Sequence, residues 1–189
     1  MPSTMSHFVC AKLISEELGL NHEDFTVGNI LPDLVENQKR SHLKFKKGQI
    51  YLPDVELAVK NIIQFDDTSL GYLAHLMLDR KYLDAYVPKF QQHGDNVPEL
   101  FSGDKIYHDY SILNTPLLEY FEIDKDKINE IMKRINTGEY PKDEASFIKN
   151  VKQINKPKVD GKLKFINFDE YVGFLKKTSN EIANDLRML

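Results

Sequence analysis

The stretch Gly71-Tyr-Leu-Ala-His-Leu-Met-Leu-Asp79 carries most of the structural information in this chain of 189 residues. Its apolar residues recur at helical spacing, and Asp66-Asp67-Thr68 offers N-cap side chains, which predicts a helix from about Ser69 to Val87. His75 and Asp79 stand four residues apart, so both project from the inward face of that helix. An inward Asp79 needs a cation or hydrogen-bond donors, because burial of an unpaired carboxylate is strongly unfavourable. The pair alone leaves two interpretations open: a shared metal ion, or a His–Asp hydrogen bond that orients a buried imidazole.

Further helices are predicted on both sides of this segment, and strand signals are weak throughout. Ser3 or Thr4 can cap a helix that runs to about Leu18, where Gly19 provides a stop. Pro116 is expected to interrupt or kink the helix that contains it. The other predicted helices cover about 54–63, 104–121, 124–136, 143–153 and 167–187, whereas 20–53 and 93–104 are expected to be irregular. The chain is therefore predicted to be all-α, with about six or seven helices.

The composition indicates an ordinary soluble globular domain. Lys and Arg total 25 and Asp and Glu total 29, so the net charge is −4, and the broad basic surface of a duplex-DNA binder is not expected. The sequence shows neither a secretory signal nor an apolar stretch typical of a transmembrane segment. The single cysteine, Cys10, excludes a disulfide within the chain and favours a cytoplasmic location. With one cysteine, any metal site must be built from His, Asp and Glu side chains.

Other histidines and an aspartate fall where they could join this His–Asp pair. His7 lies near the start of the first helix on its apolar stripe, and Asp33 follows Pro32 in a rigid turn. His42 comes nine residues after that aspartate, and His108 begins the predicted inward stripe of a later helix. Each residue alone is more typical of a structural or surface position, but their joint placement indicates a metal site.

Taken in order, these residues form a pattern that resembles a known family. The pattern runs Pro2-Ser3-x-Met5-Ser6-His7-Phe8, Gly28-x-x-x-Pro32-Asp33, His42 and Gly71-Tyr72-Leu73-x-His75-x-x-x-Asp79. It is similar to the zinc-dependent phospholipase C family, whose superfamily includes zinc-dependent single-strand nucleases, over about residues 2–115. The resemblance implies an all-α, multi-helix phospholipase C-like bundle with a metal site between its helices.

The resemblance also implies roles for individual residues. The implied metal ligands are His7, Asp33, His42, His75 and Asp79, with His108 as a further match. Asp33 would in addition be the catalytic general base beside a metal-bound water. Because the pattern ends near residue 115, we expect one domain over 1–189, with a metal-site core at 1–118 and a helical C-terminal extension at 119–189.

Two ligand positions of the family are not filled in the expected way. The histidine expected shortly after Asp79 is replaced near Leu83, and Asp84 is the nearest substitute. The glutamate expected after His108 is replaced by Ser111 or Ile112. The site is therefore expected to hold one or two metal ions. The family implies Zn²⁺, and the nitrogen and oxygen ligands also allow Fe or Mn.

The resulting prediction is a metal-dependent phosphoester hydrolase that acts on a phospholipid headgroup or on a small soluble phosphoester. Tyr72 and Arg80 are the predicted substrate-binding residues, and the basic loop Lys39–Lys47 would guide an anionic substrate. One alternative is a non-catalytic metal-binding or scaffold protein that retains the fold. Another is an HD-type phosphohydrolase built on His108-Asp109.

Overall fold

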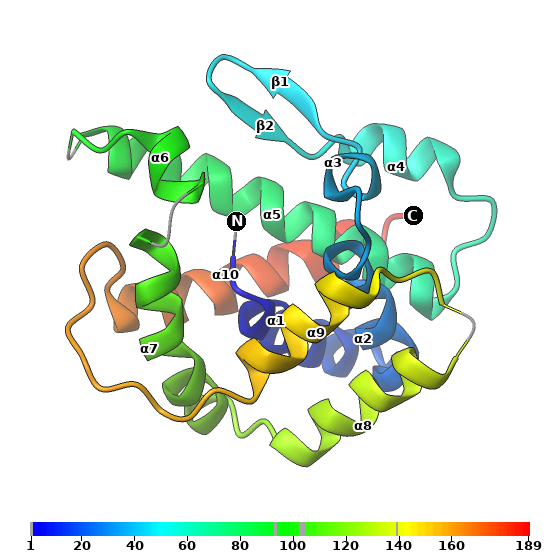
Figure 1. Cartoon of the computed structure of the whole chain (residues 1–189). Coiled ribbons are helices and arrows are strands. Elements are labelled where there is room, and N and C mark those ends of the chain that lie inside the picture. Colours follow the sequence, from blue (N-terminus) through cyan, green and yellow to red (C-terminus); the bar gives the residue numbers. More distant parts are fainter. Residues whose placement is uncertain (1, 93, 103–104, 139) are drawn as a thin grey trace.

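The computed structural model describes residues 2–92, 94–102, 105–138 and 140–189. Within these residues the chain forms ten α-helices, one 3-10 helix and one two-stranded hairpin, so the all-α prediction is confirmed (Figure 1). The helices before the hairpin are α1 (Thr4–Leu18), α2 (His22–Ile30), the 3-10 helix η1 (Leu31–Leu34) and α3 (Gln38–Ser41). The hairpin consists of β1 (Phe45–Lys47) and β2 (Ile50–Leu52). The helices after it are α4 (Val55–Asn61), α5 (Asp67–Gln92), α6 (Val97–Ser102), α7 (Lys105–Tyr120), α8 (Lys125–Thr137), α9 (Glu144–Ile154) and α10 (Phe168–Leu186).

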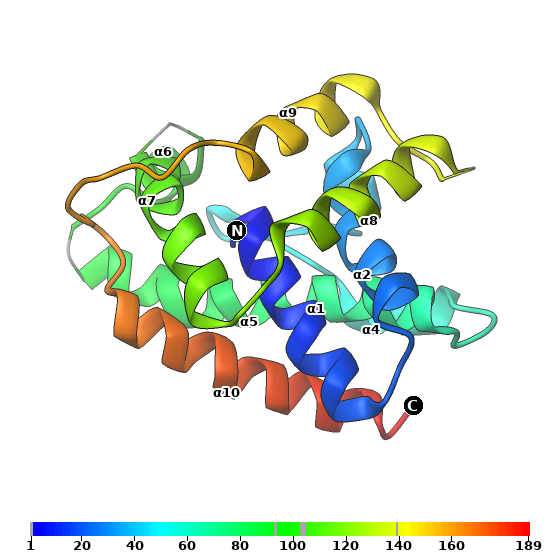
Figure 2. The same cartoon turned by 90° about the horizontal axis from the view of Figure 1, so that it is seen from below.

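Helix α1 lies at the centre of the molecule and is buried along most of its length. Its N-cap Ser3 accepts a hydrogen bond from the backbone N–H of Ser6 (3.2 Å), and Gly19 ends it in the left-handed region at φ 65°. Figure 2 shows α10 on one side of α1 and α8 and α9 on the other. Residues 4–11 are all buried, so His7 lies inside the molecule.

Helices α2 and α5 cross at a contact that requires glycine. A Cβ on Gly71 would lie 2.0 Å from the backbone oxygen of Phe25, and a Cβ on Gly28 would lie 1.8 Å from that of Thr68. Both distances are far inside van der Waals contact, so the two backbones can approach this closely because these positions carry no side chain. The crossing places the end of α2 beside the turn of α5 that carries His75.

Helix α5 is longer than the sequence predicted. Asp66 caps it, because its carboxylate accepts the Ser69 N–H (2.8 Å) while the Ser69 hydroxyl accepts the Asp66 N–H (2.9 Å). The helix continues through Pro88, and α7 likewise continues through Pro116. Of the two predicted effects of Pro116, an interruption of the helix does not occur.

The prediction of an irregular segment over 20–53 is wrong. This segment contains α2, η1, α3 and the β1–β2 hairpin. The residues that suggested a loop act as caps and turns instead. Asn21 caps α2 by accepting two backbone N–H groups (3.1 and 3.3 Å), Pro32 lies in the first turn of η1, and Gly48 makes the hairpin turn at φ 62°.

The prediction of a loop over 93–104 is also wrong in part, since α6 forms there. His93, Gly103 and Asp104 lie outside the described residues. The other predicted helices agree with α1, α4, α7, α8, α9 and α10 to within a few residues. No helix in the described part of the chain is long and apolar enough to cross a membrane.

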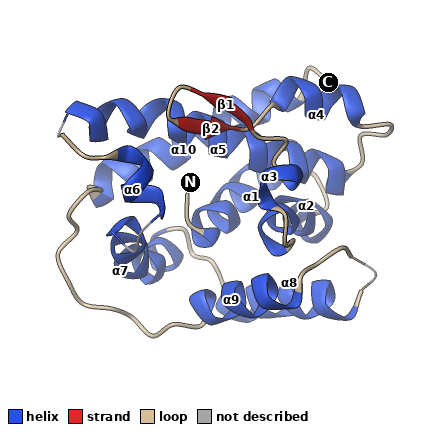
Figure 3. Cartoon of the chain, turned by 45° about the horizontal axis from the view of Figure 1, so that its top comes forward, coloured by secondary structure: helices blue, strands red, loops and turns tan. Residues whose placement is uncertain are grey.

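The C-terminal helices share one hydrophobic core with the N-terminal ones. Helix α10 packs on α1 and α5, and the Tyr171 hydroxyl lies 2.7 Å from the Ser6 hydroxyl. Just before α9, the N–H of Asp143 donates to the Leu34 carbonyl of η1 (2.7 Å). Helix α9 is thereby held against the N-terminal part of the chain, and Figure 3 shows α8 and α9 along one edge of the molecule.

Candidate metal centre

Five of the predicted metal ligands converge from four parts of the chain. They are His7 on α1, Asp33 on η1, His42 directly after α3, and His75 and Asp79 on α5. The Asp33 side chain is 15% exposed, whereas the other four are at most 1% exposed. The ring of His7 stacks on the ring of His75, with centroids 3.9 Å apart. The cluster is thus buried in the core and most open at Asp33.

The Nε2 atom of His42 lies at the centre of this cluster. It is 2.9 Å from His75 Nε2, 3.3 Å from Asp33 Oδ1 and 3.5 Å from Asp79 Oδ2. His75 Nε2 in turn lies 3.9 Å from the same Asp33 oxygen and 3.8 Å from the same Asp79 oxygen. Two imidazole nitrogens and two carboxylate oxygens therefore face one small volume. Tetrahedral zinc with bonds of about 2.0–2.1 Å separates its ligand atoms by roughly 3.3–3.5 Å. The distances from His42 Nε2 to the two carboxylate oxygens, 3.3 and 3.5 Å, match this spacing.

Backbone carbonyls orient two of the histidine rings. The Nδ1–H of His75 donates to the Asn29 carbonyl (2.6 Å), and the Nδ1–H of His42 donates to the Gln38 carbonyl (2.7 Å). In these tautomers both Nε2 atoms carry lone pairs, and the lone pairs face each other at 2.9 Å. Two neutral imidazoles repel in this arrangement, so it calls for a proton or a metal ion between them. A carbonyl on the second ring nitrogen is the usual support of a metal-bound histidine.

His7 and Asp79 contain buried polar atoms that lack a hydrogen-bond partner among the described residues. These atoms are both ring nitrogens of His7 and both carboxylate oxygens of Asp79. His7 Nε2 lies 3.5 Å from Asp79 Oδ1, beyond the usual length of a hydrogen bond. Because a buried carboxylate without a partner is costly, these atoms are well suited to hold a cation.

The charges within the cluster also favour a cation. Burial alone would raise the pKa of Asp79, but the neighbouring histidines His7, His75 and His42 outweigh it and lower that pKa to about 2. The same histidines hold the pKa of Asp33 well below its usual range, against the opposing effect of burial. Burial, reinforced by His7, lowers the pKa of His75 to about 3. Two ionised carboxylates thus lie beside a neutral imidazole. The partly buried Lys44 ammonium interacts with both carboxylates, and a divalent cation would balance the charge that remains.

The donor set fits a divalent transition metal. Two groups of side chains could each hold an ion, namely His7, His75 and Asp79, and Asp33, His42 and His75. Within each group the candidate ligand atoms lie within 4.8 Å of one another. Nitrogen and oxygen donors without a thiolate are compatible with zinc, iron and manganese.

A cleft of about 130 Å³ leads to the exposed side of Asp33. Thr4, at the start of α1, lines this cleft. One wall is α7, which contributes Tyr107 and Ser111, and the other is α9, which contributes Lys149. Figure 3 shows that α7 and α9 both lie near the N-terminus. A molecule that enters this cleft meets the cluster at Asp33.

The structure does not bring His108 to this cluster. His108 is exposed on α7, whereas its neighbour Asp109 is buried. The Asp109 carboxylate accepts hydrogen bonds from the backbone N–H groups of Lys164 (3.0 Å), Phe165 (2.7 Å) and Ile166 (3.1 Å). In the described part of the chain, neither residue belongs to a group that could hold a metal. These contacts favour a structural role for Asp109.

The two predicted substrate-binding residues lie outside the lining of this cleft. The Tyr72 hydroxyl donates to the Ser41 carbonyl (2.8 Å), so it holds the chain just before His42 against α5. Arg80 donates from Nε to Asp84 (3.0 Å). Tyr72 therefore positions the chain before His42, and Arg80 forms an ion pair at the surface.

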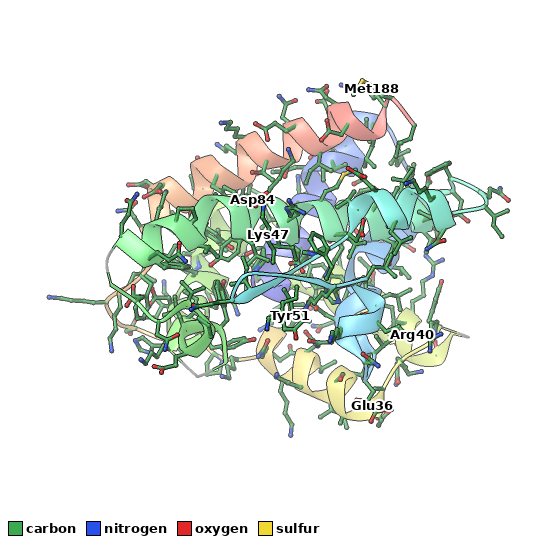
Figure 4. All side chains as sticks on the ribbon, turned by 90° about the horizontal axis from the view of Figure 1, so that it is seen from above. Glu36, Arg40, Lys47, Tyr51, Asp84 and Met188 are labelled. Carbon is green, nitrogen blue, oxygen red and sulfur yellow. The ribbon has the colours of Figure 1, made fainter. Side chains whose placement is uncertain are left out.

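Two further ligand positions that the sequence resemblance implies contribute no side chain to the described cluster. Asp84, the nearest substitute for the first, pairs with Arg80 and lies beside Lys47 of the hairpin (Figure 4). Leu83 and Ile112 are buried apolar residues. Ser111, the other residue at the second position, lines the cleft. The described cluster is therefore limited to the five side chains from α1, η1, α3 and α5.

Sequence reasoning missed the contribution of α9. The Asn150 amide donates to the Asp33 carbonyl (3.3 Å) and its oxygen accepts from the Thr4 hydroxyl (2.6 Å). A signal was available, since polar residues recur at intervals of three and four along this helix, next to an apolar stripe. The cleft-lining residues of α9 are Ser146, Lys149, Asn150 and Gln153.

No protein family, curated protein or solved structure was found to match this chain.

Proposed function

We propose that this protein is a metal-dependent phosphoester hydrolase whose metal site is formed by Asp33, His42, His75 and Asp79. The observation that carries the proposal is the convergence of two imidazole nitrogens and two carboxylate oxygens next to a cleft that reaches Asp33. A divalent cation bound there would act as a Lewis acid on a phosphoryl oxygen and would lower the pKa of a coordinated water. The resemblance to the zinc-dependent phospholipase C family supports the same chemistry.

Asp33 is the side chain best placed to handle a proton. It borders both the cluster and the cleft, and the Asn150 amide holds its backbone in place. In the reaction, the oxygen of a water molecule bonds to phosphorus and Asp33 takes a proton from that water. The P–O ester bond then breaks, and the proton passes to the leaving alcohol.

Zinc is the first candidate metal, with iron and manganese as alternatives. The site could take one ion or two, because two groups of side chains, which share His75, could each hold an ion. The Asp79 carboxylate faces both groups, since its Oδ2 atom lies 3.5 Å from His42 Nε2 and its Oδ1 atom lies 3.5 Å from His7 Nε2.

Metal analysis and hydrolysis assays test this proposal. Protein purified without a His-tag should contain about one equivalent of a transition metal or more, and should hydrolyse p-nitrophenyl phosphate or bis(p-nitrophenyl) phosphate. The substitution Asp33→Asn should lower the rate by at least ~100-fold, because it removes the base. Asp84→Asn is the control, since that carboxylate is exposed and outside the cleft. A protein that binds no transition metal, or whose hydrolysis is unaffected by Asp33→Asn, would overturn the proposal.

A second candidate is a metal-binding or scaffold protein without catalytic activity. The observation that favours it is the apolar character of Leu83 and Ile112, where the family carries additional ligands. Metal bound at full occupancy, with no hydrolysis of any phosphoester in the panel, would support this candidate.

A cytoplasmic location and a soluble substrate suit the proposal. Cys10 is buried and forms no disulfide, and burial raises the pKa of its thiol to about 12, so it needs no oxidising compartment. The cleft is lined mainly by polar side chains and offers no apolar wall for an acyl chain. Small soluble phosphoesters therefore suit it better than a whole phospholipid.

A further inference from the structure

The charge of the cleft points to the kind of substrate that it takes. Lys149 and Lys156 line the cleft, and Asp33 is its one carboxylate among the described residues. Because Asp33 belongs to the metal cluster, the remainder of the cleft is cationic. Among the described residues neither lysine forms an ion pair, so both ammonium groups are available to an anion.

The two walls of the cleft approach each other across these lysines. Lys149 Nζ on α9 lies 5.9 Å from the ring centroid of Tyr107 on α7. Both residues line the cleft, so this contact joins its two walls. An anion held by the ammonium groups would therefore lie between two protein walls, where solvent screens it less than on an open surface.

Hydrogen bonds fix the position of helix α9 relative to the metal cluster. Asn150, next to Lys149 in sequence, donates to the backbone carbonyl of Asp33 (3.3 Å) and accepts from the Thr4 hydroxyl (2.6 Å). Asn150 is itself buried. The separation between the lysines and the cluster is therefore set by the fold, as recognition of two groups on one molecule requires.

An unsatisfied acceptor lines the same cleft. The side-chain oxygen of Asn114, on α7, is buried and has no hydrogen-bond partner among the described residues. A hydroxyl group on a ligand would satisfy it. The cleft thus offers two cationic donors and one acceptor to whatever lies beyond the scissile phosphoryl group.

We propose that the cleft selects small hydroxylated phosphoesters that carry a second anionic group, a carboxylate or a phosphate, which Lys149 and Lys156 bind. This inference rests on the proposed function, because it takes the cluster as the place of the scissile phosphoryl group. The lysines are specificity residues that contact the distal part of the substrate. The chemistry of the bond cleavage stays with the cluster.

Two ligands that differ by one charged group test this inference. Glycerol 2-phosphate and 2-phosphoglycerate differ by a carboxylate in place of a hydroxymethyl group. Their dissociation constants for metal-loaded protein, or their KM values where they are hydrolysed, are measured at equal ionic strength. The wild type should bind 2-phosphoglycerate about fivefold more tightly, as expected for ion pairs at a partly exposed site.

Two double variants show whether these lysines cause the preference. The variant K149M/K156M should lose it, and the matched variant K152M/K158M should keep it. Lys152 and Lys158 come from the same segment and are exposed, but neither lines the cleft. All four side chains are exposed, so both variants should fold, which circular dichroism checks. Equal binding of the two ligands by the wild type, an equal preference in both variants, or no binding of either ligand would overturn the inference.

The experiment separates this inference from the proposed function. Binding of the two ligands needs no turnover, whereas the proposed function is judged by hydrolysis of p-nitrophenyl phosphate, which has no second anionic group. A preference that depends on Lys149 and Lys156 in a protein without hydrolytic activity would support the anion site and reject the hydrolase. Hydrolysis of p-nitrophenyl phosphate without any preference would do the reverse.

Discussion

Asp109 links two distant segments of the chain through one buried carboxylate. It lies on α7 and accepts backbone N–H groups from Lys164, Phe165 and Ile166, just before α10. Hydrogen bonds to an ionised carboxylate are among the stronger ones in proteins. The carboxylate therefore holds the connection between α9 and α10 against α7, and its role is structural.

The substitution Asp109→Ala separates this role from a metal-binding one. It leaves three backbone N–H groups without their acceptor, so the free energy of unfolding should fall by about 3 kcal/mol or more, measured by urea denaturation. The metal content should not change. Asp160→Ala, an exposed position in the same connection, should alter stability by less than ~0.5 kcal/mol. Loss of metal with unchanged stability would instead favour the HD-type alternative.

The same helix shows what sequence reasoning could and could not find at single residues. Six ligands were predicted and five of them converge, because His75 and Asp79 share a helix face and the order of motifs indicated the others. His108 lies outside the cluster, contrary to the prediction. It is adjacent to the buried Asp109, and adjacent residues on a helix point about 100° apart. The first buried residues of α7 are Ile106 and Asp109, whereas His108 between them is exposed.

At the scale of elements, the crossing of α2 and α5 positions the cluster. Gly71 should therefore tolerate no side chain. Its Cβ would lie 2.0 Å from the Phe25 carbonyl, so Gly71→Ala must push the helices apart and should lower the free energy of unfolding by roughly 3 kcal/mol or more. It should also weaken metal binding, because Asn29 of α2 orients His75.

Gly173 provides a matched control for this prediction. It lies inside α10, is exposed, and a Cβ there would meet nothing within 4 Å. Gly173→Ala should therefore raise the free energy of unfolding by roughly 0.5–1 kcal/mol, the usual gain for alanine in a helix. Equal effects of the two substitutions in thermal or urea unfolding would show that the crossing does not require glycine.

Long helices were easier to predict than the short elements between them. Helices α1 and α10 have strong caps and sustained apolar spacing. Helix α2, η1 and α3 are short, and each is held by contacts with other parts of the chain. The hairpin strands have three residues each and are mostly exposed, so no alternating pattern marks them in sequence. The cleft was missed because its walls, α7 and α9, belong to parts of the chain far from the ligand motifs.

At the scale of the whole molecule, the cluster joins side chains from α1, η1, α5 and the residue after α3. Helices α9 and α10, from the C-terminal part of the chain, pack on the elements that carry these side chains. The cluster's ionised carboxylates and facing lone pairs oppose this arrangement when no cation is present. A metal that binds the folded chain and not the unfolded one must then raise the stability of the whole molecule.

Removal of metal with EDTA should therefore lower the melting temperature. At a free metal concentration of about 100 times Kd, binding adds roughly 2.7 kcal/mol, which corresponds to about 5–10 °C for a chain of this size. Added zinc should restore the melting temperature of the wild type and of Asp84→Asn, whose carboxylate lies outside the cluster. Asp79→Asn should not respond to zinc, because it removes the charge of a buried carboxylate that faces both His7 and His42. A full zinc response in Asp79→Asn, or no change in the wild type after its metal has been removed, would show that the cluster does not link these segments through a metal.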